Sequence, residues 1–208
     1  MSAQQWVQLE ASPDLAHALQ LASRMPIAER VHRLNSDSDV HVVEDVLRQA
    51  FARDVEEIAR WCPQTWRKAV EWFGLLPFLR EGAHAINGGA GTDRARGATE
   101  DAVTWRDVSL HWREEWDRRA SLCRKPGDLA AALAPITGRF LGAEAAPGNA
   151  IPRTLGWTWE AMEQHFLKVF RMYGAGPVSV FAYLSLGILD NERLRGILVN
   201  RVVFAGAA

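Results

Sequence analysis

The chain has 208 residues, a formal net charge of −1, and 48% hydrophobic and 24% charged residues. This composition is ordinary for a folded protein and excludes a wholly disordered chain. Lys and Arg number 24 against 25 Asp and Glu, which argues against a nucleic-acid-binding domain, because such domains carry a positive excess. Cys62 and Cys123 are too few for a disulfide framework, so we expect a reducing, cytoplasmic environment. Met1–Glu10 has no basic cluster or apolar run, so we expect no signal peptide.

The N-terminal half has the residue spacing of amphipathic helices. Ser12, Pro13 and Asp14 form a helix-start signal, with a capping residue, a proline and an acid in that order. The clearest helix follows the polar cluster 36–39 and ends before Pro63. Its apolar stripe repeats with a period of about 3.6 residues and consists of Val43, Val46, Leu47, Ala50, Phe51, Val55, Ile58, Ala59 and Cys62. A further helix should contain Trp66, Val70 and Phe73.

Two segments interrupt this helical pattern. Asn87–Glu100 lacks apolar periodicity, and we expect a flexible Gly-rich loop over 87–103. This loop divides the chain into an N-terminal helical lobe, 1–86, and a C-terminal helical lobe, 104–208. A second loop, 142–156, is rich in Ala, Pro and Gly.

The C-terminal lobe contains several further helix-start signals. We expect Thr104 to cap a charged helix, Pro126 to begin another, and Thr158 to cap a third, whose expected inner face consists of Met162, Phe166, Val169, Phe170 and Tyr173. Pro177 opens an apolar helix, Val178–Leu189, which is shorter than a membrane-spanning helix requires. We expect this segment to be buried and the pair Asp190-Asn191 to cap a separate last helix.

The sequence therefore predicts an all-α fold, a multi-helix bundle of about two related lobes. The relation between the lobes depends on a weak repeat. The segments Asp14–Leu19 and Asp128–Leu133 have the same residues, Asp, Leu, Ala, Ala and Leu, at matching positions and differ only at the fourth position.

Catalytic and metal-binding motifs are missing from the sequence. No two histidines have the i,i+4 spacing of a helical zinc site, no Cys-x-x-Cys occurs, and the Gly-rich loop lacks the Gly-Lys-Ser/Thr ending of a phosphate-binding loop. Arginines flank Glu114, Glu115 and Asp117, which predicts a solvated helix face with local ion pairs. We expect a non-catalytic chain with no metal and no cofactor, and buried structural thiols at Cys62 and Cys123.

Two groups of residues are candidates for structural or partner-binding roles. Trp105, Trp112 and Trp116 share one helix face, and tryptophan is favoured at partner-binding hot spots. Near the C-terminus, Tyr183, Asp190 and Arg195 are expected to hold the last helix in place. In this hypothesis Asp190 and Arg195 form an ion pair, and the hydroxyl of a buried Tyr183 finds a partner.

The C-terminal sequence resembles that of a known protein family. The run Pro177–Leu186 includes Ala182-Tyr183-Leu184 and is followed by Asp190 and by Leu194-Arg195-Gly196-Ile197-Leu198. It is similar to the end of the C (in eukaryotes, d) subunits of the V-type and A-type rotary ATPases. The stretch Leu133–Phe140 also looks like a recurring element of that family, and the family usually has Asn where Arg193 stands.

The resemblance implies a mechanical function without catalysis. A member of this family sits on the cytoplasmic face of the membrane rotor ring, without spanning the membrane, and receives the central shaft during proton or sodium transport. Its implied partners are these rotary ATPase components, with no nucleic acid. A stand-alone helical protein-binding module is the alternative reading, and a carboxylate enzyme in a helical bundle is a third.

Overall fold

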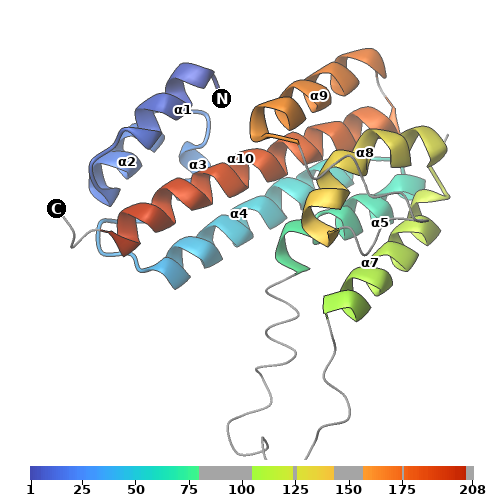
Figure 1. Ribbon diagram of the computed structural model, residues 1–208, viewed down its shortest axis with the longest axis horizontal. Coiled ribbons are helices and arrows are strands. Elements are labelled where there is room, and N and C mark those ends of the chain that lie inside the picture. The colour runs from blue at the N-terminus through green and yellow to red at the C-terminus, as the bar shows by residue number, and fades with distance from the viewer. Residues whose placement is uncertain (80–104, 124–125, 143–156, 175, 205–208) are drawn as a thin grey trace, which may run out of the picture. The chain divides into compact units, whose positions relative to one another are not determined.

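A computed structural model describes residues 1–79, 105–123, 126–142, 157–174 and 176–204. All regular elements within these ranges are helices (Figure 1), so the prediction of an all-α fold is confirmed. The loop predicted over 87–103 and nearly all of the loop predicted over 142–156 lie outside the described residues. The elements are α1 (Ala3–Glu10), α2 (Leu15–Ala22), α3 (Ala28–Val31), α4 (Val40–Trp61), α5 (Gln64–Phe73), the 3-10 helix η1 (Leu76–Phe78), α7 (Trp105–Ala120), α8 (Pro126–Leu141), α9 (Trp159–Met172) and α10 (Pro177–Val203).

The chain folds into two compact units that do not follow the predicted lobes 1–86 and 104–208. Unit 1 consists of Met1–Glu56 together with Leu186–Ala208, and unit 2 consists of Glu57–Ser185. The difference arises because the C-terminal part of α10 packs with the N-terminal helices. Both α4 and α10 therefore contribute residues to each unit.

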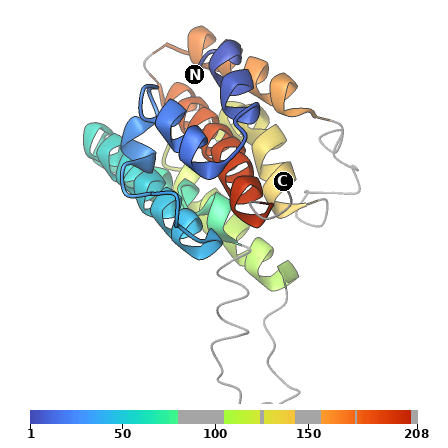
Figure 2. The ribbon, with the colours of Figure 1, turned by 90° about the vertical axis from the view of Figure 1, so that its left-hand side faces the viewer.

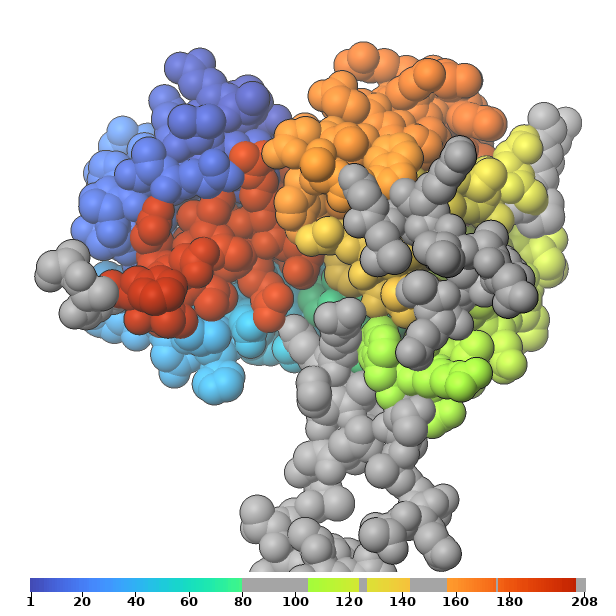
Figure 3. Space-filling model, in the orientation of Figure 1, coloured from blue at the N-terminus to red at the C-terminus, as the bar shows by residue number. Residues whose placement is uncertain are grey.

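Unit 1 begins with a helix that we did not predict. The Ser2 hydroxyl accepts a hydrogen bond from the backbone N–H of Gln5, and the Gln5 side chain accepts one from the backbone N–H of Ser2, which together form a capping box. The predicted start of α2, with Ser12 as the cap and Pro13 as the first helical residue, is two residues too early. Asp14 is the N-cap, since its carboxylate accepts from the backbone N–H of His17 at 2.8 Å, and the Ser12 hydroxyl instead donates to the carbonyl of Leu9. Helices α1 to α3 lie against the C-terminal part of α10 (Figures 2 and 3). The core of unit 1 consists of Trp6, Leu9, Leu15, Ala18, Ala22, Met25, Ile27, Val31, Val43, Leu47, Leu194, Ile197 and Leu198.

The predicted long amphipathic helix is present as α4, and within unit 1 it runs antiparallel to α10. Glu44, near the start of α4, contacts Arg195, whereas Phe51, two turns later, lies beside the earlier residue Gly187. A Cβ atom on Gly187 would lie 3.5 Å from Cε2 of Phe51. This distance is an ordinary van der Waals contact, so a methyl group at 187 would fit beside the Phe51 ring.

The predicted helix break at Asp190-Asn191 is wrong, because α10 continues from Pro177 to Val203. Asp and Asn commonly cap helices, but here the buried stripe passes through them without a change of period, and Asn191 is itself buried. Pro177 does begin the helix, as predicted. The segment Val178–Leu189 is mostly buried, with members Val178, Phe181, Ala182, Leu184, Ile188 and Leu189 in the core.

Unit 2 is organised around a cluster of aromatic rings from α5, α7 and the first part of α10. Trp112 and Trp116 stack with ring centroids 5.7 Å apart and planes inclined by 8°. Phe73 lies 5.3 Å from Trp116 and 5.3 Å from Phe181. Edge-to-face and offset arrangements of this kind stabilise a core beyond the burial of apolar area alone.

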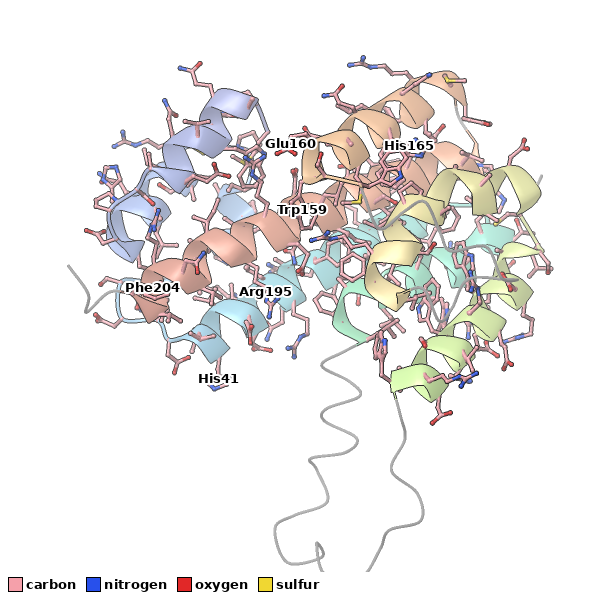
Figure 4. All side chains as sticks on the ribbon, viewed as in Figure 1. His41, Trp159, Glu160, His165, Arg195 and Phe204 are labelled. Atoms are coloured by element: carbon pink, nitrogen blue, oxygen red, sulfur yellow. The ribbon has the colours of Figure 1, made fainter. Side chains whose placement is uncertain are left out.

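Helices α8 and α9 form a second contact within unit 2. The predicted start of α9 is confirmed, because the Thr158 hydroxyl accepts a hydrogen bond from the backbone N–H of Ala161. His165 Nε2 lies 2.9 Å from the carbonyl oxygen of Ala132 on α8, and the guanidinium of Arg139 lies 4.1 Å from the ring centre of Trp159 (Figure 4). These contacts attach the first half of α9 to α8.

Candidate partner-binding surface

The prediction that Trp105, Trp112 and Trp116 form a partner-binding patch is wrong. Trp112 is 1% exposed and Trp116 is 5% exposed, so neither indole is accessible to a partner. Trp105, at the first turn of α7, is half-buried. The shared helix face was predicted correctly, but that face turns inward toward Phe73 and Phe181.

Tyr183 lies on the surface, contrary to the expectation that its hydroxyl is buried. Its side chain is 55% exposed, and two aromatic residues at the end of α9, Phe170 and Tyr173, are 44% and 42% exposed. The rings of Phe170 and Tyr183 have centroids 6.2 Å apart. We call Phe170, Tyr173 and Tyr183 the aromatic patch of unit 2. Grouped exposed aromatic rings are typical of protein interaction sites.

The end of α9 explains why two predicted core residues belong to the aromatic patch. Met162, Phe166 and Val169 are buried as expected. At about 100° per residue, Phe170 points roughly 80° away from Met162, at the edge of the apolar stripe. Tyr173 follows the last helical residue as the C-cap, beyond the part of α9 that has a buried face. The apolar stripe of the sequence alone therefore does not predict that the side chains of Phe170 and Tyr173 are exposed.

Arg195 forms ion pairs with Glu44 and Glu192, and Asp190 lies beside the N-terminal amino group, so these contacts differ from the predicted Asp190–Arg195 pair. Arg195 donates to the Oε1 atom of Glu44 from Nε at 3.1 Å and from Nη2 at 2.5 Å, and its Nη1 lies 3.6 Å from Glu192 (Figure 4). Asp190 lies 3.9 Å from the amino group of Met1. The final residues of α10 are thus held by an ion pair to α4, which is a structural contact within unit 1.

The electrostatic environment of Asp190 is unfavourable to its charge. Burial raises the pKa of this carboxyl above its ordinary value, and the cations of Met1, Arg30 and Arg193 oppose that effect only in part. The carboxylate therefore imposes a cost on the folded state that grows with its ionisation.

The acidic run on α7 forms local ion pairs, as predicted. Glu115 contacts Arg118 at 2.5 Å and Arg119 at 3.1 Å. The hydrogen bond from Arg118 lowers the pKa of Glu115 below its ordinary value, and the bond from Arg119 acts in the same direction. The guanidinium of Arg119 also covers the Trp72 ring at 4.5 Å. These contacts are those of a solvated helix face.

Three further observations concern the described part of the chain and its relation to known proteins. No group of three His, Cys, Asp or Glu side chains there is arranged to hold a metal ion. The described helices also include none with the length and apolar character needed to cross a bilayer. Comparisons with protein-family models, with curated proteins and with solved structures give no match.

Proposed function

We propose that this chain is a non-catalytic central-stalk subunit of a V-type or A-type rotary ATPase. In this role it lies at the cytoplasmic membrane face and couples the rotor shaft to the membrane rotor ring during proton or sodium transport. The observation that supports the proposal is the position of Tyr183. It belongs to the sequence run that resembles the rotary ATPase stalk family, and it stands exposed beside Phe170 in the aromatic patch.

The geometry around this residue suits a contact that transmits force. Tyr183 lies on α10, whose neighbouring residues Ala182 and Leu184 are fully buried. Phe170 lies on α9, whose inner face is packed in the same unit. A ring held by a buried backbone loses little conformational entropy when it binds a partner, which favours affinity and rigid contact.

Co-purification from native membranes tests this proposal. A tagged full-length chain should recover the shaft and rotor-ring proteins, identified by mass spectrometry. Phe170→Ala and Tyr183→Ala should reduce that recovery at least tenfold, whereas Leu122→Ala, at an exposed position of unit 2 outside the aromatic patch, should leave it unchanged. Equal recovery with all three variants would remove the aromatic patch from the interface.

A transport assay tests the coupling role separately. Membranes that lack this chain should hydrolyse ATP without pumping ions, and addition of the purified wild-type chain should restore pumping. Undiminished pumping in its absence would contradict the proposed role.

The second candidate is a stand-alone helical protein-binding module, which the same exposed aromatic patch favours. This reading predicts that a defined partner outside the rotary ATPase is recovered, that its recovery falls for Tyr183→Ala, and that ion pumping is independent of the chain. The identity of the co-purified proteins therefore separates the two candidates.

A further inference from the structure

Three serines of the chain have an arginine three residues before them, namely Ser36, Ser109 and Ser121. Ser109 is 1% exposed and its hydroxyl donates to the carbonyl of Arg106, so this serine is out of reach of an enzyme. Ser36 is exposed, but Asp37 follows it and accepts a hydrogen bond from its hydroxyl. Ser121 is also exposed, and of the three it alone has a second arginine two residues before it. Ser121 therefore combines exposure with two preceding cations.

The residues around Ser121 fit the substrate groove of a serine kinase that carries acidic side chains. Arg118 and Arg119 stand three and two residues before the serine, and Leu122 follows it. A guanidinium binds carboxylates through paired hydrogen bonds, so two arginines at a fixed spacing are well matched to a groove lined by Asp and Glu. The apolar side chain after the serine suits a hydrophobic subsite. The acid that follows Ser36 would instead be repelled by an acidic groove.

The serine and two of its flanking side chains are exposed at the C-terminal end of α7 (Figure 1). Helix α7 ends at Ala120, and Ser121 lies in the turn that follows. The side chain of Arg118 is 67% exposed, and Leu122 is 62% exposed. The Ser121 hydroxyl donates a hydrogen bond of 2.8 Å to the carbonyl of Arg118, which is a local contact within the last turn. Breaking this one hydrogen bond frees the hydroxyl to act as a nucleophile.

Arg119 becomes available to a kinase only when the last turn of α7 opens. Its guanidinium covers the Trp72 ring, and it donates hydrogen bonds to Glu115 and to the carbonyl of Lys68. The last carbonyl groups of a helix have no partner within the helix, so its terminal turn opens more readily than its middle. Since Ser121 already lies beyond the helical residues, one turn has to open. We therefore expect a kinase to modify the folded chain, but more slowly than a short peptide of the same sequence.

We propose that Ser121 is a phosphorylation site for an arginine-directed serine kinase that uses ATP. The Ser121 oxygen attacks the γ-phosphorus of ATP, a new P–O bond forms, and the bond from that phosphorus to the oxygen that bridges to ADP breaks. ADP leaves with the electron pair of the broken bond. The hydroxyl proton passes to the carboxylate of the catalytic aspartate of the kinase. The products are the phosphoserine and ADP, and nothing is oxidised or reduced.

A phosphate on Ser121 should loosen the end of α7. It carries a charge of about −1.5 to −2 at neutral pH and lies at a helix C-terminus, where the helix dipole disfavours negative charge. The serine can no longer donate to the carbonyl of Arg118, and Asp117, one turn earlier, repels the phosphate. The guanidinium of Arg118 attracts the phosphate, but it is already paired with Glu115. The midpoint temperature of thermal unfolding should therefore fall by roughly 1–3 °C on phosphorylation.

Phosphate incorporation into the folded, full-length chain tests the proposal. The purified chain is incubated with the catalytic subunit of cyclic-AMP-dependent protein kinase, ATP and Mg²⁺, and tandem mass spectrometry of its peptides locates the phosphate. Ser121 should carry roughly tenfold more phosphate than Ser36, because only Ser121 has both arginines and an apolar residue after it. A synthetic peptide spanning residues 115–124 shows that the kinase is active on this sequence.

Single-residue variants provide the controls. Ser121→Ala should abolish most of the incorporation, and Ser36→Ala should leave it unchanged. Arg118→Lys should slow it roughly tenfold, because a lysine keeps the charge but cannot form the paired hydrogen bonds. Phosphorylation of the peptide without phosphorylation of Ser121 in the folded chain would overturn the proposal, as would equal incorporation at Ser36 and Ser121. An unfolding midpoint that does not fall, relative to Ser121→Ala treated in the same way, would overturn the assigned effect on α7.

Discussion

Replacement of Phe73 by alanine should remove a large part of the stability of unit 2. The Phe73 side chain is fully buried and has ring contacts with Trp112 at 6.5 Å, Trp116 at 5.3 Å and Phe181 at 5.3 Å. Removal of a buried phenylalanine ring costs about 3–5 kcal/mol, because apolar burial is lost and a cavity remains. The three ring contacts place Phe73→Ala near the upper end of that range. This loss is comparable with half of the free energy of unfolding of an ordinary domain.

The surface residue Phe170 supplies a matched control with the same chemical change. Phe170→Ala, in the aromatic patch, should lower the free energy of unfolding by less than about 1 kcal/mol, because its ring is already partly in water. Urea unfolding followed by tryptophan fluorescence measures both variants, since Trp112 and Trp116 lie in the same cluster as Phe73. Phe73→Leu should lose only about 1–1.5 kcal/mol, and it keeps the comparison possible if the alanine variant does not fold. A loss below about 1.5 kcal/mol for Phe73→Ala, or equal losses at both positions, would refute this account of the core.

Further predictions concern the α4–α10 contact and the pH dependence of stability. Arg195→Ala should lower the free energy of unfolding by about 1 kcal/mol, since the ion pair to Glu44 is only partly buried. A double-mutant cycle with Glu44→Gln should give a coupling energy of about 0.5–1 kcal/mol between the two residues. A coupling energy of zero would contradict the assigned contact. Gly187→Ala should raise the free energy of unfolding by about 0.5–1 kcal/mol, because alanine favours the helix and its methyl group fits against Phe51 at 3.5 Å. A lower free energy of unfolding in urea would show that the methyl group lies too close to the Phe51 ring. Because the pKa of Asp190 is raised in the folded chain, there is a pH interval, from about 4 up to the raised pKa, in which the folded chain keeps a proton that the unfolded chain releases. Within that interval Asp190 makes the free energy of unfolding fall as the pH rises. Asp190→Asn should remove that decline when urea unfolding is measured across this interval, and an unchanged pH profile would contradict the assignment.

The sequence predicts the helices well because their buried faces repeat with the helical period. Val43, Leu47 and Phe51 show this in α4, and Pro177 and Thr158 identify the starts of α10 and α9. The missed helix α1 also had a local signal, because Ser2 and Gln5 have the spacing of a capping box. These features depend on residues that are close together in the sequence, so the sequence alone predicts them.

The exposed surface was harder to predict because it depends on contacts between distant segments. Periodicity groups Trp112 with Trp116, but it does not say whether that face meets α5 or a partner. Tyr183 was expected inside because its neighbours are apolar, and it turns out to be the exposed residue of a buried segment. The partner of Arg195 is likewise distant in sequence, since Glu44 lies on α4. A local Asp–Arg pattern could not identify that contact.

The discontinuity of unit 1 sets the order in which the protein can fold during its synthesis. Trp6, Leu9 and Leu47 leave the ribosome early, yet their core is completed by Leu194 and Leu198 on α10. Until that helix has been translated, the N-terminal segment keeps apolar surface in contact with water. Unit 2, by contrast, is formed from one uninterrupted stretch, Glu57–Ser185, so its core needs no residue that is translated after Ser185. The first helices to be made are thus among the last to be buried, and the apolar surface that they expose until then is prone to aggregation.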